Sequence, residues 1–112
     1  MMKDLKYNIN FEERKRSEIT TELITGYLES IYLSVTKPIS VEIYSLDNPD
    51  IILYKSVDFS GSKNLNLRCE HMRYDNTLFN YSNSKWALNE KIGFIFKGTA
   101  YTKVEVRVRY NA

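Results

Sequence analysis

A strict alternation of apolar and polar residues is the feature that most restricts the fold of this chain. Residues 102–112 read TKVEVRVRYNA. Every second side chain from Val104 to Tyr110 is apolar, and every side chain between them is charged. Because successive side chains of a β-strand point to opposite faces, this segment is predicted to be a strand with one buried face and one charged face.

The same period of two recurs along most of the sequence. Alternation of this kind is typical of strands with one buried face, and the 14 Tyr and Phe residues suit such half-buried positions. The inward-facing side chains are predicted to be Tyr7, Ile9 and Phe11; Ile39, Val41 and Ile43; Ile51, Leu53, Val57 and Phe59; Leu65, Leu67 and Cys69; and Ile92, Phe94 and Phe96.

Turn-forming residues separate these segments. SLDNPD at residues 45–50 is a strong turn signal, and SGSKN at residues 60–64 is a second one. KGTAYT at residues 97–102 joins the last two strands, and Gly98 can supply a positive φ there. Because the link is short, the last two strands are predicted to pair as an antiparallel hairpin.

Two stretches fit the alternation less well. Residues 17–35 could begin as a helix capped by Ser17, but they are rich in β-branched residues and Gly26 interrupts them. They are therefore predicted to form two strands, or one long bent strand with a bulge at Gly26. Residues 73–90 are polar and rich in Asn, and indicate a long loop with Trp86 and Leu88 packed against the core.

Seven or eight short strands with a turn signal every eight to twelve residues are typical of an all-β fold. The predicted fold is a single antiparallel β-sandwich, jelly-roll-like or immunoglobulin-like. A chain of 112 residues with 43% hydrophobic residues can form one core, so residues 1–112 are predicted to be one domain.

Composition argues against several classes of protein. The net charge is only +2, so no nucleic-acid partner is expected, and no apolar run approaches the roughly 20 residues that a membrane span needs. The first ten residues contain no apolar segment of a secretory signal. Cys69 is the single cysteine, which excludes an internal disulfide and fits assembly in a reducing cytoplasm.

Residues that could support catalysis are few. His71, the single histidine, lies two positions from Cys69, so a Cys–His pair is conceivable, but a strand histidine beside a buried thiol is the preferred interpretation. The four glycines are scattered, so no phosphate-binding loop is present, and residues 45–50 lack the spacing of a calcium loop. We expect no enzymatic activity, no cofactor, no metal and no small-molecule substrate.

The candidate interface residues fall into three groups. Arg107 and Arg109 lie on the charged face of the C-terminal strand. This face could be merely solvated, or the two arginines could contact a partner. If the strand, which includes Tyr110, lies at a sheet edge, it could also pair with another subunit. Arg14 and Arg16 belong to the mixed charge cluster EERKR, either a solvated turn or a contact for an acidic surface. Trp86 could stack on a sugar together with loop tyrosines, or simply pack.

Residues 13–44 carry a pattern of strands and turns that resembles the first half of small β-sandwich proteins of tailed-bacteriophage virions. The matching features are the charged turn at residues 13–16, the pair Gly26 and Tyr27, the segment LESIYLSV, and Pro38 followed by ISVEIY. The second half keeps the general form, with the strand NLNLRCEHM, a long loop, and a closing hairpin that ends in VEVRVRY.

This resemblance implies a non-enzymatic virion structural protein: a capsid decoration or auxiliary protein, or a component of the head–tail connector, collar or tail. Its partners would be other virion proteins and copies of itself, and it would be assembled in the host cytoplasm. Two alternatives are a β-sandwich that binds carbohydrate or a host surface through Trp86, and a nucleic-acid binder using Arg107 and Arg109. The second is disfavoured by Glu105, which lies beside these arginines.

Overall fold

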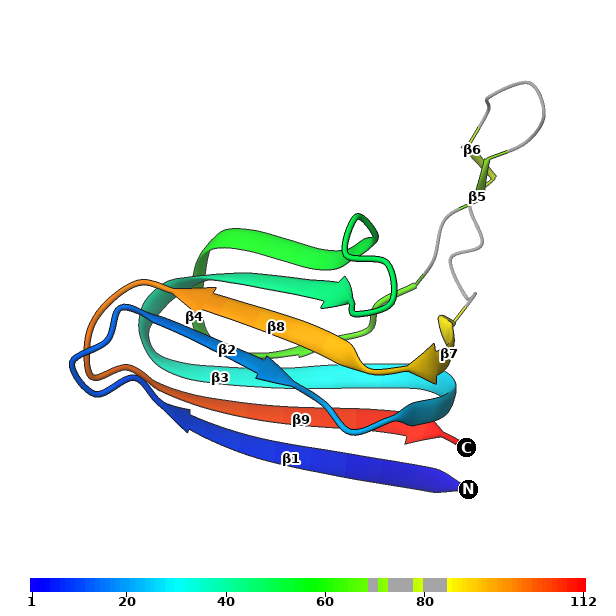
Figure 1. Ribbon diagram of the computed structural model, residues 1–112, viewed down its shortest axis with the longest axis horizontal. Coiled ribbons are helices and arrows are strands. Elements are labelled where there is room, and N and C mark those ends of the chain that lie inside the picture. Colours follow the sequence, from blue (N-terminus) through cyan, green and yellow to red (C-terminus); the bar gives the residue numbers. More distant parts are fainter. Residues whose placement is uncertain (69–70, 73–77, 80–84) are drawn as a thin grey trace.

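The computed structural model describes residues 1–68, 71–72, 78–79 and 85–112 (Figure 1). These residues form strands and turns, and none of them belongs to a helix that could cross a membrane. The strands are β1 (Met2–Asn10), β2 (Arg16–Thr20), β3 (Ile24–Ser45), β4 (Ile52–Leu65), β5 (His71–Met72), β6 (Leu78–Phe79), β7 (Ala87–Glu90), β8 (Ile92–Lys97) and β9 (Lys103–Asn111).

Seven of these strands form one antiparallel sheet. Its order is β1-β9-β3-β8-β2, and β4 and β7 also pair with β3. The short strands β5 and β6 pair with each other as a separate two-stranded ladder. The predicted all-β, antiparallel fold is therefore confirmed.

The sheet is curled, and the long strands β3 and β4 run through both of its halves. The first half of β3 pairs with β9, and its second half, from Ser40 to Ser45, pairs with β8. Figure 1 shows β3 and β4 turning together at one end of the molecule, so that the half of the sheet with β1 and β9 faces the half with β2 and β8. One continuous sheet thus supplies the two facing layers of a sandwich-like fold.

The core lies between these facing halves. Alternate residues of β3, β8 and β9 contribute most of it, as the period of two predicts, and Val104, Val106 and Val108 are buried as expected. Tyr7, Ile9 and Leu67 are only partly buried, whereas Leu88 is buried and Trp86 packs against the core. The fully buried large side chains are Phe11, Ile24, Leu28, Ile31, Leu33, Val41, Ile43, Phe59, Ile92, Phe94, Phe96 and Val106.

Residues 17–35 belong to two strands, β2 and the first part of β3, which confirms the first of the two predicted alternatives. The break lies at residues 21–23, where Thr21 exchanges hydrogen bonds with the backbone of Ile92, and not at Gly26. Gly26 is inside β3 with φ of 140°. A Cβ there would overlap the carbonyl oxygen of Asn111 at the end of β9, so close backbone approach requires glycine at this position.

Two predictions about β4 are wrong. SGSKN does not form a turn, because β4 continues through it to Leu65. Val57 does not face the core and is 81% exposed. The reason is a bulge: between the paired positions Ile39–Phe59 and Val41–Ser56, β3 advances by two residues and β4 by three. The extra residue reverses which side chains of β4 point inward.

The last two strands do not form the predicted hairpin. β8 and β9 each pair with β3, on its second and first half respectively. The link of residues 98–102 therefore carries the chain from one layer to the other. Its positive φ belongs to Tyr101, at 62°, and not to Gly98. A short link fits this crossing as well as a hairpin, so its length alone does not distinguish them.

Candidate functional site

The charged side of β9 lies in the middle of a four-stranded polar surface. β9 pairs with β1 on one side and with β3 on the other, so it is an internal strand. β4 continues the surface beyond β3. We call this surface the polar face. Its cross-strand rows are Asp4–Arg109–Ser30, Lys6–Arg107–Tyr32–Asn64 and Asn8–Glu105–Ser34–Ser62.

Arg107 contacts side chains on two strands, and Lys6 of a third strand shares its acidic partner Glu105. Its Nε and one terminal nitrogen donate hydrogen bonds to the same oxygen of Glu105, at 3.2 and 3.0 Å. Its guanidinium lies 5.6 Å from the ring centre of Tyr32 on β3, within the range of a cation–π interaction. Lys6 on β1 reaches the same Glu105 oxygen at 3.2 Å. These contacts fix the position of Arg107 on the polar face.

Neighbouring charges shift the pKa values of Glu105 and Arg109. Hydrogen bonds from Arg107 and from Lys6 hold the pKa of Glu105 below its ordinary value of 4.5. Arg109 donates a hydrogen bond from Nε to Asp4 at 3.0 Å, which raises the pKa of Arg109. Both shifts favour the charged forms of Glu105 and Arg109 at neutral pH.

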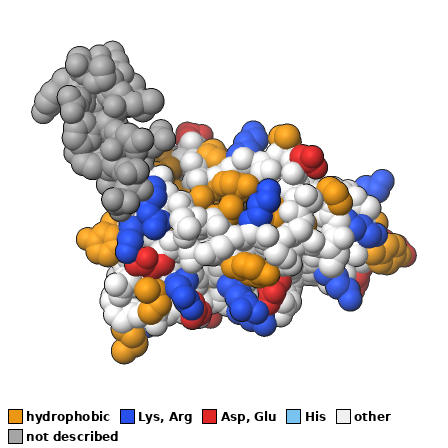
Figure 2. Space-filling model, turned by 180° about the vertical axis from the view of Figure 1, so that it is seen from behind, with side chains coloured by type: hydrophobic (Ala, Val, Ile, Leu, Met, Phe, Trp, Pro, Cys, Tyr) orange, Lys and Arg blue, Asp and Glu red, His pale blue; other side chains and the backbone are white. Residues whose placement is uncertain are grey.

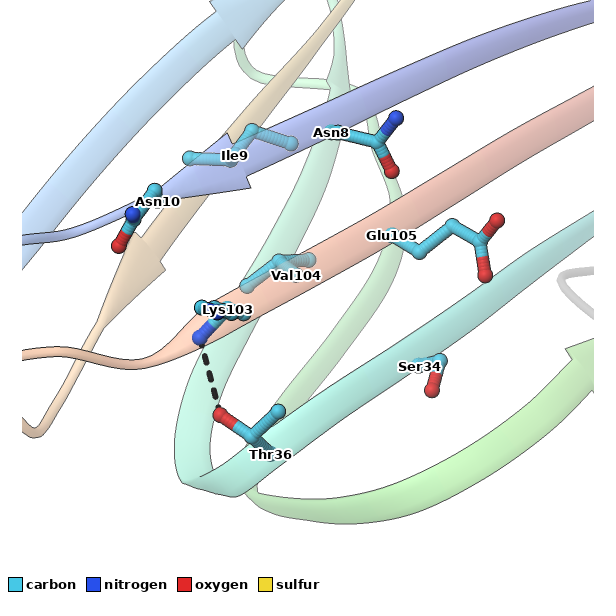
Figure 3. Close-up of a pocket in the computed structure, with 8 residues that line it drawn as sticks. All are labelled: Asn8, Ile9, Asn10, Ser34, Thr36, Lys103, Val104 and Glu105. Atoms are coloured by element: carbon cyan, nitrogen blue, oxygen red, sulfur yellow. Dashed lines mark hydrogen bonds between the residues drawn. The ribbon is translucent and has the colours of Figure 1, made fainter.

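Two hollows flank the pair of Glu105 and Arg107. The larger is about 450 Å³ and lies where β1, β9 and the bend of β3 meet (Figure 3). Its polar lining includes Asn8, Asn10 and Ser34, and the backbone N–H of Lys103 donates a hydrogen bond to Thr36 Oγ1 across its edge at 2.9 Å. The smaller is about 200 Å³ and is lined by Asp4, Ser30, Tyr32, Asn64, Arg107 and Arg109.

Tyr110, the third candidate residue of the C-terminal strand, does not lie on the polar face. Tyr110 is only 7% exposed and belongs to the core, on the opposite side of β9 from Arg107 and Arg109. Since both edges of β9 are already paired, β9 is not the edge strand that the pairing hypothesis required. The edges of the ordered path of strands are β1 and β2.

Arg14 and Arg16 lie near the link between β1 and β2, at one end of the curled sheet (Figure 1). Arg14 borders a shallow hollow with Glu12, Glu13 and Tyr101. Arg16 forms an ion pair with Glu18 on its own strand. The structure therefore places this cluster apart from the polar face, with acidic neighbours of its own.

Trp86 directly precedes β7, at the other end of the sheet. Its ring is partly buried against the core, and its Nε1 is buried without a hydrogen-bond partner among the residues described. Its carbonyl accepts a hydrogen bond from the N–H of Leu28. Tyr74 and Tyr81, the tyrosines of the predicted loop, lie outside the described residues. The Trp86 ring is therefore partly packed against the core rather than fully exposed for stacking on a sugar.

Cys69 lies outside the described residues, and His71 is described as a position in β5 without its side chain. In the described ranges, no three His, Cys, Asp or Glu side chains lie close enough to hold a metal ion.

Sequence reasoning identified Arg107 and Arg109 but missed the residues that hold them. Asp4 and Lys6 also alternate with apolar residues, which is a signal for an exposed strand face, but their pairing with β9 depends on the sheet register. No protein-family model matches the chain, and no curated protein matches it.

Proposed function

We propose that the chain is a non-enzymatic structural protein of a tailed-bacteriophage virion that docks on neighbouring subunits through its polar face. The observation that carries the docking proposal is the fixed position of Arg107 and Arg109 on an internal strand. Glu105 and Tyr32 hold the first, and Asp4 holds the second. The assignment to a virion is supported by the pattern of strands and turns in residues 13–44.

An internal strand binds partners through side chains, because its backbone groups are already paired. Arginines that are ordered before binding lose less conformational freedom when a partner arrives, and arginine is enriched among residues that dominate interface energies. Arg107 uses only part of its five N–H donors on Glu105, and Arg109 uses only its Nε on Asp4. The remaining donors suit carboxylate or carbonyl oxygens of a neighbouring subunit.

A protein partner fits the charge pattern better than a nucleic acid does. Asp4 and Glu105 lie between the basic residues and would repel phosphates. Figure 2 shows acidic and basic side chains interspersed on the face that it presents, with apolar side chains among them. Protein interfaces combine such polar groups with apolar contacts.

The test is incorporation of an epitope-tagged chain into purified virus particles. The variant Arg107→Ser/Arg109→Ser removes both arginines of the polar face. The matched control Arg14→Ser/Arg16→Ser removes the same charge near the link between β1 and β2. Both variants should melt near the wild-type temperature, because these side chains are exposed.

We expect the polar-face variant to be incorporated at least about tenfold less than the wild type, as for the loss of interface residues that dominate binding. The control variant should be incorporated normally. Normal incorporation of a well-folded Arg107→Ser/Arg109→Ser chain would refute docking through the polar face. Absence of the wild-type chain from particles would refute the assignment to a virion.

A further inference from the structure

The strand β1 is an edge strand with a regular, unpaired outer side. It pairs with β9 over nine consecutive positions without a register shift. It ends the ordered path of strands, and within the described part of the chain no strand pairs with its other edge. Residues 2–10 contain no proline, glycine or bulge that would prevent further pairing. The free edge of β1 is therefore competent to add a strand.

The hydrogen-bond pattern shows which backbone groups point outward. The C=O of Met1 accepts a hydrogen bond from Ala112, and the N–H of Phe11 donates one to Thr102. In an antiparallel ladder, hydrogen-bonded pairs alternate with non-hydrogen-bonded pairs, so the odd-numbered residues of β1 bond to β9. The N–H and C=O groups of the even-numbered residues therefore point away from the sheet.

We propose that a second copy of the chain pairs with β1 in antiparallel orientation, with Leu5 at the twofold axis. This register places Asp4 of each copy opposite Lys6 of the other. The outward backbone groups of both residues then meet as hydrogen-bonded pairs. The proposal is independent of docking through the polar face, because it concerns the sheet edge and is tested on the isolated chain.

Charge complementarity selects this register among its neighbours. An axis at Lys6 would place the two Lys6 side chains opposite each other, which is unfavourable. An axis at Tyr7 would place Lys6 opposite Asn8 and form no ion pair. With the axis at Leu5, Asp4 lies between Arg109 of its own copy and Lys6 of the other, so that charges alternate across the interface. Lys6, a charge of the kind that guards sheet edges against aggregation, already pairs with Glu105 of its own copy and thus gains a second acidic partner.

Apolar contacts support the same arrangement. Leu5, Tyr7 and Ile9 line the inner side of β1 but are only partly buried against the core. A neighbouring β1 would cover part of their exposed surface and extend the sheet from β9 through both copies of β1. The other strands with an unpaired edge in the described sheet are weaker candidates. β2 is only five residues long, and its Arg16 and Glu18 pair with each other. β4 is longer, but register shifts interrupt its ladder with β3, so its outer edge is less regular than that of β1.

The register can be tested by disulfide cross-linking in a Cys69→Ser background. Facing residues of a non-hydrogen-bonded antiparallel pair have Cα atoms about 4.5 Å apart, within the range that a disulfide can bridge. Leu5→Cys should therefore form a covalent dimer under mild oxidation, measured on a non-reducing gel. Lys6→Cys and Tyr7→Cys report the two neighbouring registers and should cross-link at least about tenfold more slowly. Faster cross-linking of either one would refute the register.

The pairing itself can be tested with proline at an outward position. Asn8→Pro removes an outward N–H but no hydrogen bond to β9, and Asn8→Ala keeps the N–H as the matched control. In sedimentation experiments we expect the wild type and Asn8→Ala to dimerise, and Asn8→Pro to raise the dissociation constant roughly tenfold or more. A monomeric wild type, together with no Leu5→Cys cross-link, would overturn the proposal, as would equal dimerisation of a folded Asn8→Pro chain.

Discussion

Truncation of Val106 tests the structure where the core and the polar face share one strand. Val106 lies on β9 with no exposed surface, opposite Tyr7 of β1 and Leu33 of β3. Val106→Ala removes two buried methyl groups. At about 0.8 kcal/mol for each buried carbon group, the transfer cost is about 1.6 kcal/mol, and the residual cavity adds to it. We therefore expect the free energy of unfolding to fall by about 2–3 kcal/mol.

Val57 provides a control with the same chemical change. It is 81% exposed at the bulge of β4, so Val57→Ala should change the free energy of unfolding by less than about 0.5 kcal/mol. Urea denaturation followed by tryptophan fluorescence measures both variants, because the chain has the single tryptophan Trp86. Equal losses for Val106→Ala and Val57→Ala would show that β9 does not bury the valine face, or that β4 lacks the bulge.

Two further predictions concern Gly26 and Glu105. Gly26→Ala should lower the free energy of unfolding by about 3 kcal/mol, because the added Cβ overlaps the backbone of Asn111, whereas Gly61→Ala faces open space and should cost about 1 kcal/mol. Since Arg107 and Lys6 lower the folded-state pKa of Glu105, its stabilising contribution is present above pH 4.5 and is lost as the pH falls through that lowered pKa. Acid titration should therefore show a difference between wild type and Glu105→Gln that is largest above pH 4.5 and shrinks below it; a constant difference would contradict the ion pair.

The fold class was predictable because the alternation is strict where strands are regular. Val104, Val106 and Val108 follow the period of two without an interruption, and the structure buries all three. The same rule failed for Val57, because a bulge inserts one residue and its position depends on the partner strand. A period read from one segment contains no information about an insertion relative to another segment.

The strand connections were less predictable than the strands. Residues 60–64 have turn-forming composition, yet β4 continues through them. Gly61, with φ of 71°, lets the strand bend there instead of ending. Pairing with β3 over both halves of the curled sheet outweighs the local preference, and this long-range pairing is not visible in a short window of sequence.

The candidate site shows the same division. Alternation placed Arg107 and Arg109 on an exposed face, but it did not reveal what holds them. Asp4, the partner of Arg109, is 105 positions away in the sequence, and Tyr32 lies on a third strand. Only the register of β1, β9 and β3 brings these residues together. Tyr110 lies on the same side of β9 as the buried valines, so the alternation already predicted its burial. The hypothesis that Tyr110 is an interface residue ignored this pattern.

The most direct test of the proposed role is a cryo-EM density map of intact virus particles that are produced in cells expressing the chain. The prediction is that the curled sheet is found in the capsid, connector, collar or tail, with Arg107 and Arg109 in contact with acidic or carbonyl oxygens of a neighbouring subunit. A particle that lacks the chain, or one in which the polar face is directed to solvent, would contradict it.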